Sequence, residues 1–131
     1  KMSKSKNNII DIFVDDKSLR KQIMKIETRS MSVEDPKDPE NCNVFKLYKL
    51  LASDEKTKEM AIKYKAGNYG YGHAKQELFE LICDEFSEPR NKFNQLMSNT
   101  DIIELELKEG ARKASEIANK VLERVRNNIG Y

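Results

Sequence analysis

The sequence predicts an all-α protein, an irregular bundle of four to five helices that follows an N-terminal loop and extended arm. The composition supports this prediction, because the 131 residues include only five Gly, three Pro and no Trp. A chain rich in Lys, Glu, Leu and Ala favours helix over sheet. The hydrophobic pattern supports it too, since apolar residues recur at helical spacing along most of the chain. This length corresponds to about one domain.

The first 16 residues differ from the rest of the sequence. Residues 1–8 are polar and rich in Lys, which predicts a loop, and residues 9–14 form a short apolar run with β-branched side chains. Such a run is compatible with a strand remnant or with a segment that docks on another domain. Asp15-Asp16 then predicts a helix start, with an Asp as the N-cap before Lys17. The apolar residues of that helix fall on one face, at Leu19, Ile23 and Ile26.

The longest stretch without helical periodicity is residues 28–42, which contains two Asp-Pro steps. A residue that precedes proline avoids the α conformation, so this stretch predicts a loop. Helical spacing resumes at Val44, and Asn41 or Asn43 is the predicted N-cap.

Two further segments have helical spacing. One is predicted to begin at residues 53–55, where Ser, Asp and Glu offer caps, and to end at Gly67. The next follows a turn at residues 68–73. Pro89 interrupts its apolar stripe, so either one helix kinks there or a new helix begins at Ser87. We favour a single kinked helix, because the stripe keeps its phase across the proline. Its members, expected in the core, are Leu78, Leu81, Ile82, Phe86, Phe93 and Met97.

The last helix is predicted over residues 101–128, with caps available at residues 99–101. Its small apolar residues form a narrow stripe that we expect to be a core contact between helices. They are Ala111, Ala114, Ala118, Val121 and Val125. Its basic residues alternate with Glu, as on a solvated helix face with i,i+4 pairs, and we expect that face to be exposed. They are Arg112, Lys113, Lys120, Arg124 and Arg126.

The charge distribution points to an anionic ligand near the N-terminus. The net charge is only +2, which is weak for an autonomous nucleic-acid binder. Residues 1–30, however, carry a local excess of four positive charges, whereas residues 67–131 carry an excess of two negative charges. A phosphate ligand is therefore favoured electrostatically at the N-terminal end.

The remaining composition argues against several classes of protein. Cys42, Cys83 and His73 are isolated from one another in the sequence, so no metal site is expected. Thiols of this kind, without a secretory segment, fit a reducing cytosol and predict a cytoplasmic protein. No apolar run approaches the roughly 18–20 residues of a membrane span, so no membrane association is expected.

The most informative motif is Lys1-Met2-Ser3-Lys4-Ser5. When a carboxylate attacks the α-phosphate of ATP, negative charge grows on the departing pyrophosphate, and nearby ammonium groups stabilise it. Serine hydroxyls can donate hydrogen bonds to phosphate oxygens. Met2 is the apolar residue that would hold the loop when it closes. By composition alone, the same residues also fit a Lys-rich terminus without a role.

KMSKS is the signature of class I aminoacyl-tRNA synthetases, and from this motif onward the chain resembles the C-terminal part of bacterial tryptophanyl-tRNA synthetases. Further matching patterns occur in order, at residues 10–23, 28–30, 43–48, 71–75 and 109–114. These later patterns point to the tryptophan enzymes rather than to their tyrosine relatives. Family members often have Asp where this chain has Arg29, so no role is carried over to that position.

The resemblance implies that residues 1–16 are the KMSKS loop and a connector from a Rossmann-type catalytic domain, whose own motifs are not in this sequence. Residues 17–131 would then be a helical domain that binds the anticodon arm of tRNA. Lys1 and Lys4 would be catalytic, with Lys4 the more important, and Met2, Ser3 and Ser5 would complete the ATP-binding loop.

The same resemblance implies the ligands and the assembly. ATP with Mg²⁺, tryptophan and tRNA(Trp) would be the ligands of the parent enzyme, a tryptophan–tRNA ligase, and the family is homodimeric. With half an active site, the chain alone is expected to be inactive.

The turn and helix start at residues 68–75 are the candidate RNA contact. Aromatic rings stack on unpaired bases and Lys binds phosphate, so His73 and Lys75, which are expected to be exposed, are candidates to bind tRNA. Tyr69 and Tyr71 are expected to pack on neighbouring helices instead. Two other interpretations stay open: a free-standing, non-catalytic helical RNA-binding module, and a purely structural bundle.

Overall fold

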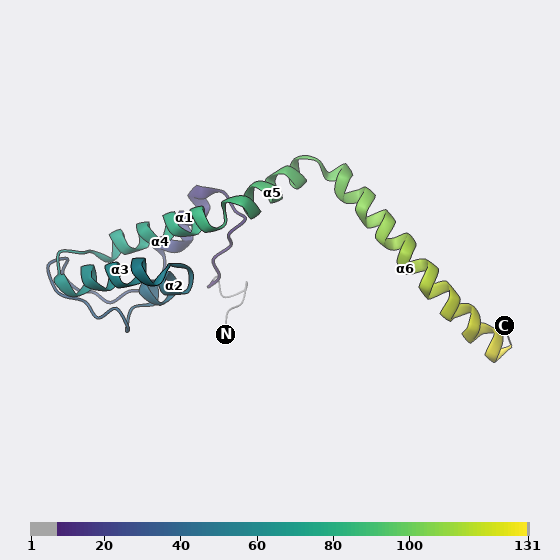
Figure 1. The fold of residues 1–131 in the computed structure, drawn as a ribbon, viewed down its shortest axis with the longest axis horizontal. Coiled ribbons are helices and arrows are strands. Elements are labelled where there is room, and N and C mark those ends of the chain that lie inside the picture. The colour runs from purple at the N-terminus through teal and green to yellow at the C-terminus, as the bar shows by residue number, and fades with distance from the viewer. Residues whose placement is uncertain (1–7, 131) are drawn as a thin grey trace. The chain divides into compact units, whose positions relative to one another are not determined.

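The structure, a computed structural model, describes residues 8–130 and contains six α-helices and no strand within that range (Figure 1). The all-helical prediction is confirmed, although the helices number six rather than four to five. The chain divides after Arg90 into two units, which are described separately below.

The first unit holds four whole helices, α1 (Asp16–Met24), α2 (Asn43–Leu51), α3 (Asp54–Ala66) and α4 (Tyr71–Glu85), and the start of α5 (Ser87–Ser98). α4 packs against both α1 and α2, and α2 packs against α3 (Figure 1). The largest side chains of the resulting core that are shielded from solvent are Tyr64, Phe45, Leu19, Ile23, Met60, Leu78 and Val44. Each of these helices therefore buries the apolar face that its sequence specifies.

The first helix begins where the sequence predicts. Asp15 is the N-cap of α1, and its carboxylate accepts hydrogen bonds from the backbone N–H of Ser18 at 3.0 Å and from the Ser18 hydroxyl at 2.6 Å. These bonds satisfy a donor that the first turn leaves without a helical partner. Leu19 and Ile23 are buried, whereas Ile26 lies beyond the end of the helix and is half-buried.

The third helix also follows its predicted signals. Ser53 is the N-cap of α3 and its hydroxyl accepts a hydrogen bond from the Lys56 N–H. Gly67 ends the helix with a φ of +76°, a conformation that side chains rarely adopt. A Cβ atom at this position would lie 2.4 Å from the Glu34 carbonyl oxygen, so glycine also permits the close approach of the preceding loop.

Two predicted boundaries are wrong. The N-cap of α2 is Cys42, which makes no side-chain cap hydrogen bond, rather than Asn41 or Asn43. The predicted kinked helix is instead two helices, because Phe86 leaves the helical conformation with φ −102° and ψ 16°. Pro89 is the third residue of α5, where its missing N–H costs no hydrogen bond because the first turn has no helical acceptors. The hydrophobic stripe keeps its phase because only one residue separates the helices.

The loop at residues 28–42 is held by one buried lysine. Lys37 is 3% exposed, and its ammonium group donates to the carbonyl oxygens of Ser32, Val33 and Asp35 at 2.9, 3.1 and 2.8 Å. Its backbone N–H donates to the Tyr64 carbonyl at 2.7 Å. A segment without helical periodicity thereby acquires a defined path across α3, because its carbonyls find a donor.

The apolar run at residues 9–14 does not form a strand. Ile10, Ile12 and Val14 pack partly against the core of the first unit, and the Asp11 N–H donates to the Gln22 side-chain oxygen at 2.8 Å. Phe13 is 42% exposed. Much of the apolar surface that could have docked on another domain is therefore used within this chain.

The second unit contains the rest of α5 and the 30-residue helix α6 (Thr100–Ile129). None of the residues of α6 is buried, so the predicted core role of its small-residue stripe is wrong for this chain. The prediction that Phe93 and Met97 of α5 lie in the core is also wrong, since these side chains are 36% and 56% exposed. Periodicity selects the face of a helix, but burial also requires a surface that covers it. The basic face of α6 is exposed, as predicted.

Candidate functional site

The motif that dominates the sequence lies outside the described residues. Lys1, Met2, Ser3, Lys4 and Ser5 precede residue 8, so the ATP-binding roles assigned to them stay predictions. The structure does describe the connector that follows the motif, the turn at residues 68–73 and a hollow beside that turn.

Arg90 fixes the connector to the helices. Its guanidinium group donates to the Val14 carbonyl at 2.9 Å and to the Asp16 carboxylate at 2.6 Å, and it contacts the Cys83 sulfur at 3.4 Å. Burial raises the pKa of the Cys83 thiol although Arg90 opposes this effect, so the sulfur is a neutral acceptor. The residues that follow the motif are thus held at a defined place on α1 and α4.

The tyrosines of the turn are packed as predicted. The Tyr64 ring lies at the centre of an aromatic cluster, with ring centroids 5.5 Å from Tyr69, 6.2 Å from Tyr71 and 5.7 Å from Phe45. Burial raises the pKa of the Tyr64 and Tyr69 hydroxyls. Rings held in this way serve as walls rather than as mobile stacking platforms.

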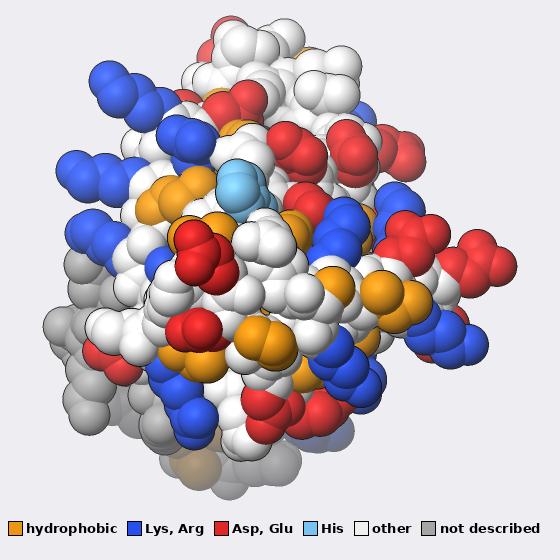
Figure 2. All heavy atoms as spheres, turned by 90° about the vertical axis from the view of Figure 1, so that its left-hand side faces the viewer, with side chains coloured by type: hydrophobic (Ala, Val, Ile, Leu, Met, Phe, Trp, Pro, Cys, Tyr) orange, Lys and Arg blue, Asp and Glu red, His pale blue; other side chains and the backbone are white. Residues whose placement is uncertain are grey.

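The two predicted RNA contacts have different surroundings. His73 is exposed, with its ring 6.0 Å from that of Tyr69 (Figure 2). Lys75 is half-buried and donates to the Met24 carbonyl at 3.0 Å, which satisfies an acceptor in the last turn of α1. The expectation that Lys75 is exposed is therefore wrong, and its ammonium group has a structural partner. Figure 2 shows Lys, Arg, Asp and Glu side chains intermingled around His73 rather than a face of one charge.

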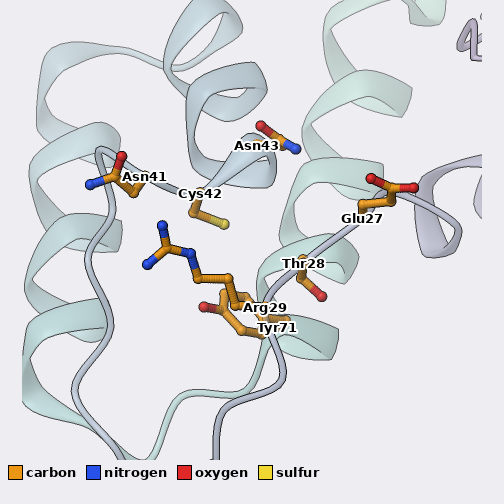
Figure 3. A pocket seen from close by; sticks show the side chains of 7 residues that line it. All are labelled: Glu27, Thr28, Arg29, Asn41, Cys42, Asn43 and Tyr71. Atoms are coloured by element: carbon orange, nitrogen blue, oxygen red, sulfur yellow. The ribbon is translucent and has the colours of Figure 1, made fainter.

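A hollow of about 250 Å³ lies between the loop and the starts of α2 and α4. It is lined by Glu27, Thr28, Arg29, Asn41, Cys42, Asn43 and Tyr71 (Figure 3). In Figure 3 the guanidinium group of Arg29 points toward Asn41 and Cys42, and the Tyr71 ring lies near the base of its side chain. The Cys42 sulfur is in contact with the Tyr64 hydroxyl at 3.3 Å, so this thiol is part of the wall.

The hollow brings together residues from three of the separate sequence patterns. Thr28 and Arg29 belong to the pattern at residues 28–30, Asn43 to the pattern at residues 43–48, and Tyr71 to the pattern at residues 71–75. Sequence reasoning missed this site, because no periodicity links residues so far apart. The available signal for this site was the presence of these three patterns in one chain.

Among residues 8–130, no group of three or more His, Cys, Asp or Glu side chains could hold a metal ion. No helix in that range combines the length and apolarity that crossing a membrane requires.

The comparison with protein families identifies the chain. Residues 1–87, which include the KMSKS motif, match the model of the class I tRNA synthetases for tryptophan and tyrosine. The chain belongs to this synthetase family. The suspected relationship to the tryptophan enzymes is confirmed by individual relatives. The tryptophan–tRNA ligases of Campylobacter jejuni (strain RM1221) and Rhodopirellula baltica are 45% and 44% identical to it over 99% of this chain.

Solved synthetase structures agree with this assignment. The crystal structure of tryptophanyl-tRNA synthetase from Campylobacter jejuni, complexed with ADP and tryptophane, matches all of this chain with a TM-score of 0.93 and 45% identity. This chain covers 41% of that structure and 41% of each of the two ligases. The synthetase chain described here therefore spans about two fifths of the length of these relatives.

Proposed function

We propose that this chain is the part of a tryptophan–tRNA ligase that carries the KMSKS loop and the helical tRNA-binding region. The observation that carries the proposal is the 45% identity over 99% of the chain to a ligase of that name, together with a family match that includes the motif. In this assignment, residues 1–16 connect to a Rossmann-type catalytic domain and residues 17–131 form the tRNA-binding domain. The parent enzyme is a cytoplasmic homodimer.

The proposed reaction begins with the activation of tryptophan. Its carboxylate attacks the α-phosphate of ATP, a new carboxyl–phosphate bond forms, and the bond to the β-phosphate breaks to release pyrophosphate. Lys1 and Lys4 stabilise the charge on the leaving pyrophosphate, and Ser3 and Ser5 donate hydrogen bonds to its oxygens. Mg²⁺ enters with ATP, held by the phosphates of the substrate. Tryptophan is then transferred from the adenylate to tRNA(Trp), as the carboxyl–phosphate bond breaks and AMP leaves.

Structural support comes from the connector. Arg90 binds the Val14 carbonyl and Asp16, and Gln22 binds the Asp11 N–H, so the chain that leads away from the motif is fastened to the helices. A loop that closes over ATP needs one fixed end, because catalysis depends on cations that reach the same position in each turnover. Arg90 supplies such a fixed end within the described residues.

The test is ATP–pyrophosphate exchange in the presence of tryptophan. The full-length enzyme should catalyse exchange, and Lys4→Ala should lower its rate about 100-fold or more, as removal of other transition-state donors does. Lys46→Ala, an exposed lysine on α2, is the control and should retain the full rate. The isolated 131-residue chain should show no exchange. Robust exchange by that chain, free of full-length enzyme, would overturn the assignment of half an active site.

The alternatives predict other outcomes. A free-standing RNA-binding module should bind tRNA with micromolar or tighter affinity and a steep salt dependence. Undetectable binding at moderate salt removes that alternative. An unchanged exchange rate in full-length Lys4→Ala would favour a purely structural bundle.

A further inference from the structure

The hollow beside the turn has the size of a subsite. Its volume is about 250 Å³, below the roughly 300–1,000 Å³ of pockets that enclose drug-sized ligands. A hollow of this size suits a single base with its phosphate at the rim. Its lining combines a guanidinium group, two amide side chains, a hydroxyl group and an aromatic ring, which together suit a nucleotide.

The cation of this site is available for a ligand. Arg29 is exposed, and no carboxylate among residues 8–130 forms an ion pair with it. Asp38 has its pKa lowered, first by the hydrogen bond from Asn41 and to a smaller extent by the positive charge of Arg29. Because Asn41 already binds Asp38, that carboxylate is engaged, and the Arg29 guanidinium can bind a phosphate in its forked geometry.

The wall of the hollow is rigid. The Tyr71 hydroxyl donates to the Met31 sulfur at 3.6 Å, its ring meets Tyr64 edge-on, and the Lys37 ammonium group lies 5.7 Å from its centroid. A base that enters thus meets an aromatic surface that is already in place, which lowers the entropic cost of binding.

The polar rim can distinguish one base edge from another. Asn43 lies at the first position of α2, and Asn41 keeps its carbonyl oxygen as an acceptor because its amide nitrogen is used by Asp38. Glu27 adds a carboxylate acceptor on the same lining. Amide and carboxylate groups hydrogen-bond to base edges, whereas arginine binds phosphate without regard to sequence.

We propose that this hollow binds one unpaired nucleotide of the tRNA, with its phosphate on Arg29, its base against Tyr71 and its edge on Asn41 and Asn43. The inference rests on the proposed function, and it moves the expected RNA contact from Lys75 to the neighbouring loop.

The first experiment measures the KM for tRNA in aminoacylation by the full-length enzyme across a salt series, with active enzyme titrated by ATP–pyrophosphate exchange. Arg29→Ala should raise KM about tenfold, the size of one hydrogen-bonded charge contact. It should also reduce the slope of log affinity against log salt by about 0.7, because one phosphate contact to a single strand is lost. Arg29→Lys should keep the slope and recover part of the affinity. Arg126→Ala, the same charge change on α6, is the control and should match the unmodified enzyme.

The second experiment separates base contacts from phosphate contacts. Asn43→Ala should weaken binding without a change in salt slope. The loss should disappear for a tRNA in which one unpaired nucleotide is changed, because that base can no longer be read.

The outcomes distinguish the two proposals. If the enzyme charges tRNA(Trp) but Arg29→Ala and Asn43→Ala both behave as Arg126→Ala does, the nucleotide site is wrong and the proposed function stands. If the full-length enzyme neither activates tryptophan nor charges tRNA, the proposed function is wrong and this site falls with it.

Discussion

Residues 8–90 and residues 91–130 both carry apolar residues at helical spacing, but only the first set has a core. Leu78 of α4 is fully buried, whereas Leu122 of α6 is 45% exposed. The first unit has four whole helices whose faces cover one another, and within the second unit the apolar face of α6 has no such cover. The difference shows that a hydrophobic pattern encodes a face, while stability comes from the area that another element removes from water.

This comparison predicts the largest loss of stability when a buried core side chain is truncated. Leu78→Ala should lower the free energy of unfolding of the 131-residue chain by about 2–5 kcal/mol, the cost of a cavity in a packed interior. Leu122→Ala removes the same atoms from α6 and should change it by less than about 0.5 kcal/mol. Urea denaturation followed by circular dichroism measures both. A cost for Leu122→Ala close to that for Leu78→Ala would mean that α6 is covered in solution, for example by a second copy of the chain.

A smaller effect tests the buried lysine of the first unit. Lys37→Met should cost about 2 kcal/mol, because it leaves the carbonyls of Ser32, Val33 and Asp35 without their donor. Hydrogen exchange of residues 28–42 should become faster at the same time. Lys46→Met, on an exposed face of α2, serves as the control. If loop exchange in Lys37→Met is unchanged, the loop is held by other contacts.

The same substitution at two glycines should have opposite signs. Gly67→Ala should destabilise the first unit by more than about 1 kcal/mol, because its φ is +76° and the Glu34 oxygen would lie 2.4 Å from the new Cβ atom. Gly110→Ala should stabilise α6 by about 0.5–1 kcal/mol, because a Cβ atom there would have no atom within 4 Å outside its chain neighbours and the adjoining helix backbone. Thermal melting and helix content by circular dichroism test the pair. A loss of stability in Gly110→Ala would reveal a partner packed closely on α6.

The smallest effect concerns the N-cap of α1. The Ser18 hydroxyl and N–H lower the pKa of Asp15, so this carboxylate stabilises the fold above its unfolded pKa of about 3.9, and the contribution is lost as the pH falls through the lower folded value. Asp15→Asn keeps a capping side chain but removes the titration. Its melting temperature should therefore fall less than that of the unmodified chain on acidification below about pH 4. Glu123→Gln, on α6, provides the charge-matched control, and identical acid profiles for all three proteins would contradict the assignment.

Local sequence signals predicted where helices begin and end better than they predicted which side chains meet across the fold. Asp15, Ser53 and Gly67 each act where their chemistry predicts, because caps and stops depend on neighbours a few residues away. A new helix at Ser87 was the less favoured of two predictions, since the one-residue interruption at Phe86 does not disturb the phase of the stripe. Lys75 looked like a free cation, but it reaches the Met24 carbonyl across 51 positions of sequence.

The sequence by itself determined the helical class, the family and the motif that would bind ATP, because these are written in short patterns and in composition. Only the tertiary structure decided which stripes are buried, that Arg90 fastens the connector, and that Arg29, Asn43 and Tyr71 line one hollow. The physical reason is the distance along the chain over which each interaction acts. Capping and periodicity act within a few residues, whereas burial and the assembly of a site depend on which distant surfaces meet.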